Sequence, residues 1–276
     1  MPSLQLSLPN GEAVGDERMA MQLDQVVPFG RSLDEYRQMF ALSENDLGRT
    51  IIGIGDGPAS FNAEMYALGK HVVSVDPLFA FSADDIEWRF YAVVDAIIAQ
   101  VKATPDDWVW TYHRSPEHLH QHRINVLARF LADYDAGKTA GRYVVGELPR
   151  LDIPDNHVEL ALCSHFLFLY SDQFSYEFHR ASMLDMLRVA SEVRVFPLLT
   201  LGLQPSPYVE PLMLELQSLG YRAQIRTVPY ELQRGGNQML SITRAVNGAQ
   251  PAVPGRHAAD LRRETSQEEG VIHDSC

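Results

Sequence analysis

The amino-acid sequence predicts an α/β fold with a mostly parallel sheet and helices on both of its faces. Short apolar, β-branched runs alternate along the chain with segments whose apolar residues recur at helical spacing. The first of these runs ends in a glycine-rich turn that opens a helix. A length of 276 residues is enough for one large domain with its own core.

Composition argues against several classes of partner. The net charge of -13 repels phosphate backbones, so we expect no nucleic acid partner. The two cysteines, Cys163 and Cys276, suggest neither a disulfide framework nor a metal site, which favours a cytoplasmic setting. Neither a signal peptide nor an 18-residue apolar run is found, so we expect no membrane association.

The predicted elements begin after a flexible N-terminal arm over residues 1–30. Ser32 and Glu35 form a capping box that predicts a helix ending near Leu42. Residues 50–55 form the first buried strand, a helix is expected from Pro58 to Gly69, and residues 71–75 form the second strand. One strand–helix–strand unit results.

The second half of the predicted domain, which spans residues 31–245, holds the other strands. Residues 82–137 are expected to be a helical insertion after strand two, with helices over 83–102 and 116–135. A polar tail over residues 246–276 is expected to be disordered. The remaining predicted strands are 142–145, 158–163, 192–198, 221–227 and 238–243, with helices over 176–190 and 207–219, which gives seven strands in all.

The first motif with chemical meaning is the glycine loop after strand one, which contains Gly53, Gly55, Asp56 and Gly57. Glycines allow a sharp turn and a close approach of the backbone to a ligand. Free N–H groups at the following helix start suit an anionic group. The placement is typical of a nucleotide-binding loop.

Three further polar sites follow predicted strand ends. Asp76 ends strand two, where an acid can accept both ribose hydroxyls of an adenosine-containing cofactor, although it can also simply cap a turn before Pro77. Glu147 follows strand three; it can accept the adenine amino group or remain a solvated loop residue. Ser164 and His165 follow strand four at the same crevice, where His165 is a candidate general base, although a histidine beside apolar residues is more often structural.

In this order and spacing, the glycine loop, the acid after strand two, the ELP…IPDN segment and the CSHFLFLY strand end resemble the class I S-adenosylmethionine (AdoMet)-dependent methyltransferases. The resemblance covers residues 50–245. Stretches such as GDGPASFNAE and VVSVDPLFAF are also similar to a bacterial group of methyltransferases with no assigned substrate. The resemblance implies a Rossmann-like sheet and AdoMet as cofactor.

The resemblance also implies roles for individual residues. Arg31 would reach the methionine carboxylate, and a helix carrying Tyr36 and Met39 would cover the cofactor. One departure matters, because Gly53 stands where the family usually has an acid that helps to hold the cofactor's amino group; Asp56 is a candidate substitute. In the remaining implied roles, the methionine part lies over Gly55 and Gly57, the ribose on Asp76, the adenine beside Pro77, Leu78, Glu147 and Leu148, and the sulfonium opposite Ser164 and His165.

The expected reaction is methyl transfer to a small molecule, which needs in-line positioning of the nucleophile. The aromatic residues of the helical insertion suit a flat or apolar acceptor, or they fill the interface between insertion and sheet. We expect His165 to be catalytic, without a metal. The candidate substrate-binding residues are Arg89, Trp110, Tyr208 and Arg234.

Two other functions remain open at this point. A non-catalytic AdoMet-binding or protein-interaction module on the same fold is compatible with Gly53 and with the lack of a diagnostic acceptor motif. An NAD(P)-dependent oxidoreductase also uses a glycine loop and a strand-end acid, although the loop here is GxGxG rather than GxGxxG. His118 and His122 share a helix face, but we interpret that face as solvated rather than metal-binding.

Overall fold

The computed structural model describes residues 28–244. The predicted arm therefore lies outside the described residues except for residues 28–30, and so does the predicted tail over 246–276.

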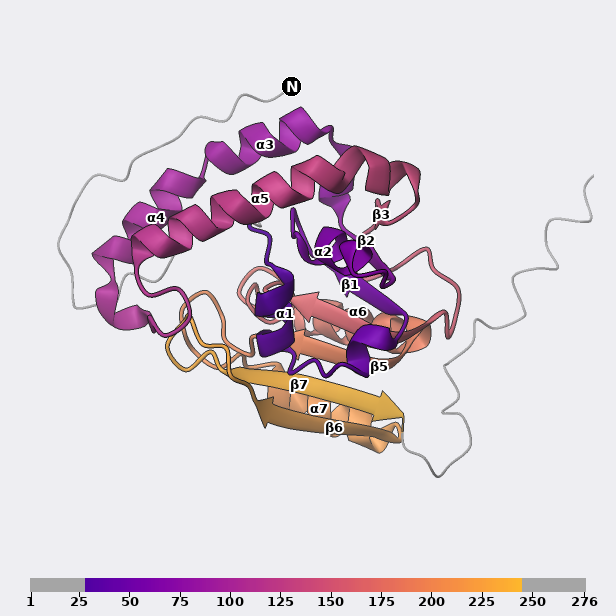
Figure 1. Cartoon of the computed structure of the whole chain (residues 1–276). Helices are drawn as coiled ribbons and strands as arrows, with labels where there is room; N and C mark the ends of the chain where they lie inside the picture. Colours follow the sequence, from indigo (N-terminus) through magenta and orange to yellow (C-terminus); the bar gives the residue numbers. More distant parts are fainter. Residues whose placement is uncertain (1–27, 245–276) are drawn as a thin grey trace, which may run out of the picture. The chain divides into compact units, whose positions relative to one another are not determined.

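A seven-stranded sheet organises the described residues, in the order β3-β2-β1-β4-β5-β7-β6 (Figure 1). The first five strands of this order are parallel, and β7 runs antiparallel to both β5 and β6. The predicted strands are all present, with shifts of a few residues at their ends. Their bounds are β1 Ile51–Ile54, β2 Val72–Val75, β3 Tyr143–Val144, β4 Val158–Ser164, β5 Ala190–Phe196, β6 Tyr221–Thr227 and β7 Gln238–Arg244.

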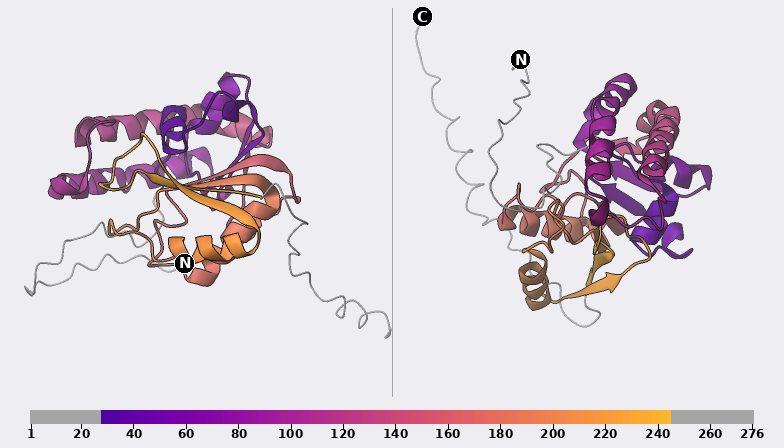
Figure 2. Two further views of the ribbon diagram at one scale, coloured as in Figure 1. Left: turned by 90° about the horizontal axis from the view of Figure 1, so that it is seen from below. Right: turned by 90° about the vertical axis from the view of Figure 1, so that its left-hand side faces the viewer.

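Helices cover both faces of this sheet, as Figure 2 shows from two further directions. The α-helices are α1 Leu33–Met39, α2 Phe61–Ala67, α3 Ala83–Tyr91, α4 Val94–Ala103, α5 Pro116–Thr139, α6 Tyr176–Val189 and α7 Val209–Ser218. The 3-10 helices are η1 Asp46–Gly48, η2 Pro77–Ala80 and η3 Pro105–Asp107.

Alternation along the strands divides the core into two clusters, one on each face. In β4, Leu160 and Leu162 point into the cluster shared with α1, α2 and α5. Their neighbours Ala161 and Cys163 point into the cluster shared with α6 and α7. All four side chains are completely buried, as expected for a parallel strand covered on both faces.

The segment between β2 and β3 differs in detail from the prediction. One helix was expected over residues 83–102, but the chain breaks at Val93 into α3 and α4. Both helices pack on α5, and each buries its own apolar face there, Ile86 and Phe90 from α3 and Ile97 and Val101 from α4. A break lets two short helices each pack an apolar face on the same long helix.

The first crossover helix also begins later than predicted. Pro58 was expected to start it, but α2 starts at Phe61 with Ser60 as its N-cap. The carbonyl of Pro58 lies against Gly30, only 2.0 Å from where a Cβ would stand, so residues 57–60 form a turn packed on the segment before α1. Leu68 is the C-cap of α2 and is exposed. No helix in residues 28–244 is long and apolar enough to cross a membrane.

Candidate functional site

A cavity of about 440 Å³ opens at the carboxyl ends of the parallel strands. This is the edge at which open α/β sheets bind ligands, and the volume lies in the range of small-molecule sites. Its lining includes Gly55–Gly57 after β1, Asp76–Leu78 after β2, Gly146–Leu148 after β3 and Ser164–Phe166 after β4.

The loops after β1 and β2 are joined through Asp76. Its carboxylate accepts hydrogen bonds from the backbone N–H groups of Gly57, at 2.8 Å, and Leu78, at 2.7 Å. Gly55 and Gly57 have φ of 68° and 56°, a conformation that glycine adopts without strain. Burial raises the pKa of Asp76. The acid therefore holds the glycine turn in place and still has lone pairs on the cavity side.

Gly53 leaves space that the Asp56 carboxylate fills. A Cβ at Gly53 would stand 1.9 Å from Asp56 Oδ2. Tyr36 donates its hydroxyl hydrogen to Asp56 Oδ1 at 2.5 Å, and Ser74 donates to Oδ2 at 2.7 Å. Burial outweighs these hydrogen bonds and raises the pKa of Asp56 to about 7. The departure from the family pattern at Gly53 thus coincides with an acid placed three residues later.

This arrangement corrects the interpretation of α1 as a direct cover for a cofactor. Tyr36 does not line the cavity; its ring is fully buried and stacks on Phe61 with ring centroids 4.1 Å apart. Met39 is likewise buried in the core. Both side chains face the sheet because α1 lies against α2, so Tyr36 acts on the site only through Asp56.

Arg31 lines the cavity just before α1. Its Nη1 donates to the Phe29 carbonyl at 2.5 Å, while its buried Nε has no hydrogen-bond partner among the described residues. Burial and the nearby Arg123 lower the pKa of Arg31 to about 10, so it remains a cation at neutral pH. A buried cation with unused donors favours an anionic ligand group.

A buried ion pair lies behind Arg31. Glu35 on α1 and Arg123 on α5 pair through two N–H···O contacts of 2.8 and 2.9 Å, and both side chains are buried. Glu35 also accepts from Tyr230 at 3.0 Å and contacts His122 at 3.1 Å. Although burial opposes it, these partners lower the pKa of Glu35 well below its ordinary value. Two guanidinium groups near the cavity therefore share one carboxylate.

Ser164 and His165 lie at the end of β4 and line the cavity. His165 has φ of 50° and donates its backbone N–H to the Phe196 carbonyl at 2.6 Å, which turns the chain out of the sheet. The Ser164 hydroxyl lies 2.9 Å from His165 Nδ1. Burial, followed by Arg31 and Arg123, lowers the pKa of His165 well below its ordinary value, so its imidazole is neutral.

The residues predicted to surround an adenine also line this cavity. Pro77 and Leu78 form its edge after β2, and Leu148 is buried beside them in the lining. Glu147 is exposed, and its carboxylate makes no hydrogen bond to any residue in the described range.

Comparisons with known proteins found similar chains by sequence and by structure. No protein-family model matches the chain. An uncharacterized protein of Methanocaldococcus jannaschii is 28% identical over 225 residues, which are 81% of this chain and 99% of that protein. That relative is archaeal, so the similarity extends beyond the bacterial group named above.

Two solved structures are similar to the chain. Magnesium protoporphyrin IX methyltransferase from Synechocystis PCC 6803, with bound AdoMet, is 11% identical with a TM-score of 0.41, over 77% of this chain and 78% of that one. An AdoMet-dependent methyltransferase from Aquifex aeolicus is 14% identical with a TM-score of 0.35, over 78% and 88%. The chain itself has a seven-stranded sheet with antiparallel β7, a glycine turn after β1 and an acid after β2. This is the Rossmann-like α/β sheet that the sequence resemblance implies.

The structure does not bring the four predicted substrate-binding residues to the cavity. Arg89 is exposed, with its guanidinium 3.9 Å from the centre of the Phe81 ring. Tyr208 caps α7 and packs beside Tyr176 and His179. These positions depend on long-range packing, which chain order did not reveal.

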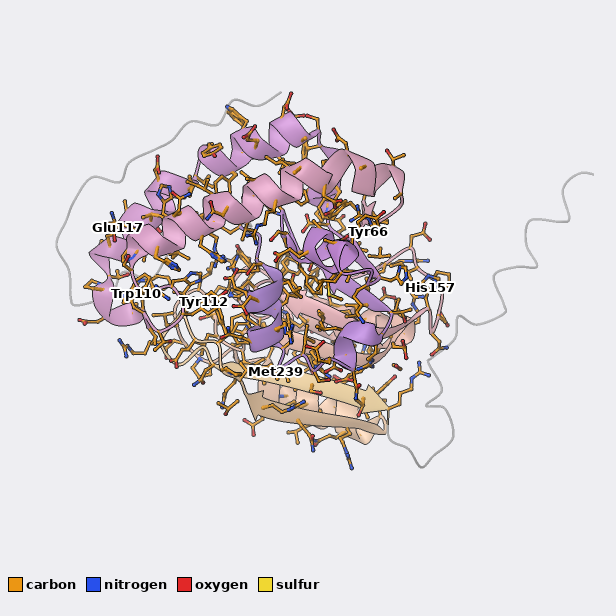
Figure 3. The ribbon with its side chains drawn as sticks, in the orientation of Figure 1. Tyr66, Trp110, Tyr112, Glu117, His157 and Met239 are labelled. Carbon is orange, nitrogen blue, oxygen red and sulfur yellow. The ribbon has the colours of Figure 1, made fainter. Side chains whose placement is uncertain are left out.

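Trp110 and Arg234 lie close to the cavity but do not line it. Trp110 packs against the core from the segment between η3 and α5, where Figure 3 shows it beside Tyr112. Arg234 donates to the backbone carbonyls of Asp106 and Trp108 instead of reaching into the cavity.

Trp108, one of the aromatic residues of the insertion that were expected to form an acceptor pocket, lines the cavity. Phe29, from the predicted arm, and Gln233 also line it and were missed by sequence reasoning. In an extended segment, Trp108 and Trp110 point to one side and Val109 to the other. Alternation alone therefore does not show which of the two tryptophans lines the cavity. Further aromatic lining comes from Phe81, Phe166, Tyr170, Phe174 and Phe178.

The histidines of α5 take part in hydrogen bonding. His122 contacts Glu35, and its ring centroid lies 6.3 Å from that of His118. Within residues 28–244, no group of three or more His, Cys, Asp or Glu side chains could hold a metal ion.

Proposed function

We propose that this chain is an AdoMet-dependent methyltransferase that acts on a small molecule. One observation supports this most strongly: Asp76 joins the glycine turn to the end of β2 in a cavity that also exposes the buried cation Arg31. Such a cavity matches a ligand with a carboxylate at one end and a ribose at the other.

The donors and acceptors of the cavity fit AdoMet. Arg31 would hold the methionine carboxylate, because its Nε and Nη2 groups make no hydrogen bond to any residue in the range 28–244. Asp76 would accept the ribose hydroxyls, and Glu147 with the Leu148 backbone would recognise the adenine edge. Asp56 takes the place of the acid that is absent at Gly53, but its carboxylate is directed to Tyr36 and Ser74. It would act on the amino group through the loop rather than by direct contact.

Methyl transfer requires the protein mainly to position the reactants and to exclude water from them. When bound, AdoMet supplies an electrophilic methyl group on its sulfonium sulfur. His165, neutral and beside Ser164, would accept a hydrogen bond from the acceptor's nucleophilic O–H or N–H and orient its lone pair. Its lowered pKa makes it a weak base, so positioning outweighs proton transfer. The apolar lining would exclude water from the reacting atoms.

Two alternatives would use the same cavity. A non-catalytic AdoMet-binding or protein-interaction module would bind the cofactor without turnover, and an NAD(P)-dependent oxidoreductase would bind a dinucleotide at the same loop. Cofactor binding distinguishes the oxidoreductase from the other two functions. Methyl transfer then distinguishes the methyltransferase from the non-catalytic module.

Isothermal titration with S-adenosylhomocysteine, the reaction product, tests the cofactor assignment. We expect micromolar binding, weakened at least about tenfold in Asp76→Asn, because an amide loses charged hydrogen bonds to the ribose and to the loop. Asp84→Asn is a matched control, since Asp84 is an exposed residue of α3. NADH should not bind.

Failure of S-adenosylhomocysteine to bind the wild-type protein would refute the methyltransferase proposal. Binding without transfer of a labelled methyl group from AdoMet to any molecule in an acceptor screen would favour the non-catalytic module.

A further inference from the structure

One wall of the cavity is built by two segments that clamp together. The segment around Trp108 and the loop before β7 form an isolated antiparallel bridge, Trp108 to Gln233. Val109 donates to the Leu232 carbonyl at 2.8 Å, and the Arg234 backbone donates to the Asp107 carbonyl at 2.9 Å.

The Arg234 side chain reinforces this clamp. Its Nε donates to the Asp106 carbonyl at 2.6 Å and its Nη2 to the Trp108 carbonyl at 3.1 Å. The backbone carbonyl of Gln233 accepts a hydrogen bond from the backbone N–H of Gly236 at 2.8 Å. Five hydrogen bonds from backbone or guanidinium groups thus hold the two lining residues Trp108 and Gln233 in place at the cavity.

Trp108 presents an apolar surface to the cavity. Its ring N–H is already used in a hydrogen bond to Thr104 Oγ1 at 3.0 Å, and the side chain is 6% exposed. Phe29, Leu119 and Leu232 lie in the same lining. A flat ring would gain both burial and aromatic contact against this surface.

Gln233 contributes the polar group of this wall. The residue is 9% exposed, yet its side-chain amide makes no hydrogen bond within residues 28–244. The amide is therefore accessible from the cavity, and it offers both a donor and an acceptor to a ligand. None of the motifs assigned to the cofactor includes this residue.

The charges near this wall are already compensated. Arg123 also lines the cavity, but it is bound through both terminal nitrogens to Glu35. Behind it, burial lowers the pKa of His113 to about 4, so that ring is neutral at pH 7. In the proposed complex Arg31 is paired with the carboxylate of the cofactor, so an ion placed against the wall would lose its hydration without gaining an unpaired partner, whereas an uncharged molecule would not.

We propose that this wall is the acceptor subsite and that it takes an uncharged, planar aromatic molecule. The ring packs against Trp108, and one hydroxyl or amide-like substituent pairs with the Gln233 amide. Arg234 is a positioning residue that holds both. This inference rests on the methyltransferase proposal, because it assigns the cofactor to the glycine-loop side of the same cavity.

Three matched probes test it by calorimetry on protein saturated with S-adenosylhomocysteine: 2-naphthol, 2-methylnaphthalene and 2-naphthoate. We expect 2-naphthol to bind about three to ten times more tightly than 2-methylnaphthalene, the range for one neutral hydrogen bond. The anion 2-naphthoate should bind most weakly. In Gln233→Leu the first difference should vanish while 2-methylnaphthalene and S-adenosylhomocysteine bind as before.

Gln224→Leu is the control, because Gln224 is exposed on β6. The inference is overturned if 2-naphthoate binds most tightly, if the hydroxyl gives no advantage, or if its advantage survives in Gln233→Leu. Absence of S-adenosylhomocysteine binding would instead overturn the methyltransferase proposal, and this inference with it, before any probe is added.

Discussion

At the residue scale, Gly53 and Asp56 are coupled because the Asp56 carboxylate occupies the space where a side chain at Gly53 would stand. In Gly53→Ala the new Cβ would meet the Asp56 carboxylate at 1.9 Å, and β1 is buried along its whole length. We expect a loss of about 1–3 kcal/mol in the free energy of unfolding, the usual effect of overpacking a core. Urea unfolding measures it. Gly48→Ala is the control, because a Cβ there meets nothing within 4 Å.

A double variant shows whether the two residues act as a pair. Asp56→Ala removes the carboxylate that a Cβ at Gly53 would meet, so adding Gly53→Ala to it should cost little further stability. The coupling free energy should be at least about 1 kcal/mol, in the range for residues in contact. Additive effects in urea unfolding would show that the Gly53 substitution acts on something other than Asp56.

The Asp56 carboxyl group should make the stability of the fold depend on pH. Its pKa is raised to about 7 by burial, above the value of 3.8 for an unperturbed aspartate. Between these values the unfolded chain releases the proton while the folded chain keeps it, so this group lowers stability as pH rises from about 4 to about 7. The slope approaches about 1.4 kcal/mol per pH unit. Urea denaturation across this window should show the stability of wild type falling relative to that of Asp56→Asn, because the other titrating groups are common to both proteins; a difference that does not change with pH would contradict the prediction.

The cofactor side of the cavity could be predicted because chain order locates it. The residues that follow β1, β2, β3 and β4 come together wherever these strands are parallel neighbours. The glycine loop identified the residues after β1. Trp108 and Gln233 could not be found in this way, since 125 residues separate them and only the packing of loops joins them. Glu35 was recognised as a cap, but no local signal showed that it also pairs with Arg123.

At the element scale, α1 is held to α5 through a buried charge. Glu35→Gln would remove the carboxylate opposite Arg123 and leave that guanidinium buried without its counter-ion. We expect a loss of about 3–5 kcal/mol in unfolding free energy, the range for breaking one partner of a buried pair. Glu117→Gln, which breaks the exposed pair with Lys102, should leave the unfolding free energy nearly unchanged. Equal effects in thermal or urea unfolding would deny Glu35 this role.

The elements themselves followed closely from periodicity. Strands buried on both faces read as continuous apolar runs, and β6 was predicted with its observed bounds, Tyr221–Thr227. The break between α3 and α4 was not foreseen, because residues 83–102 keep a helical pattern through it. Only the demand that both helices pack on α5 divides them.

At the scale of the whole molecule, the cavity joins parts of the chain that the sheet alone does not hold together. Its lining draws on the segment before α1, on the ends of four strands, on α4 and α5, and on the loop before β7. A ligand there contacts groups that come together only in the folded chain. By linkage, such a ligand stabilises the fold in proportion to the logarithm of its concentration.

S-adenosylhomocysteine should therefore raise the thermal midpoint. At 100 times its dissociation constant the gain is about 2.7 kcal/mol, which corresponds to roughly 5–10 °C for a domain of this size. Differential scanning calorimetry measures the shift, with NADH as the negative control. In Asp76→Asn, the same ligand concentration should give a smaller shift, because the lost ribose contacts weaken binding to the folded state. An unchanged wild-type midpoint at this saturation would mean that the ligand does not bind the folded cavity preferentially.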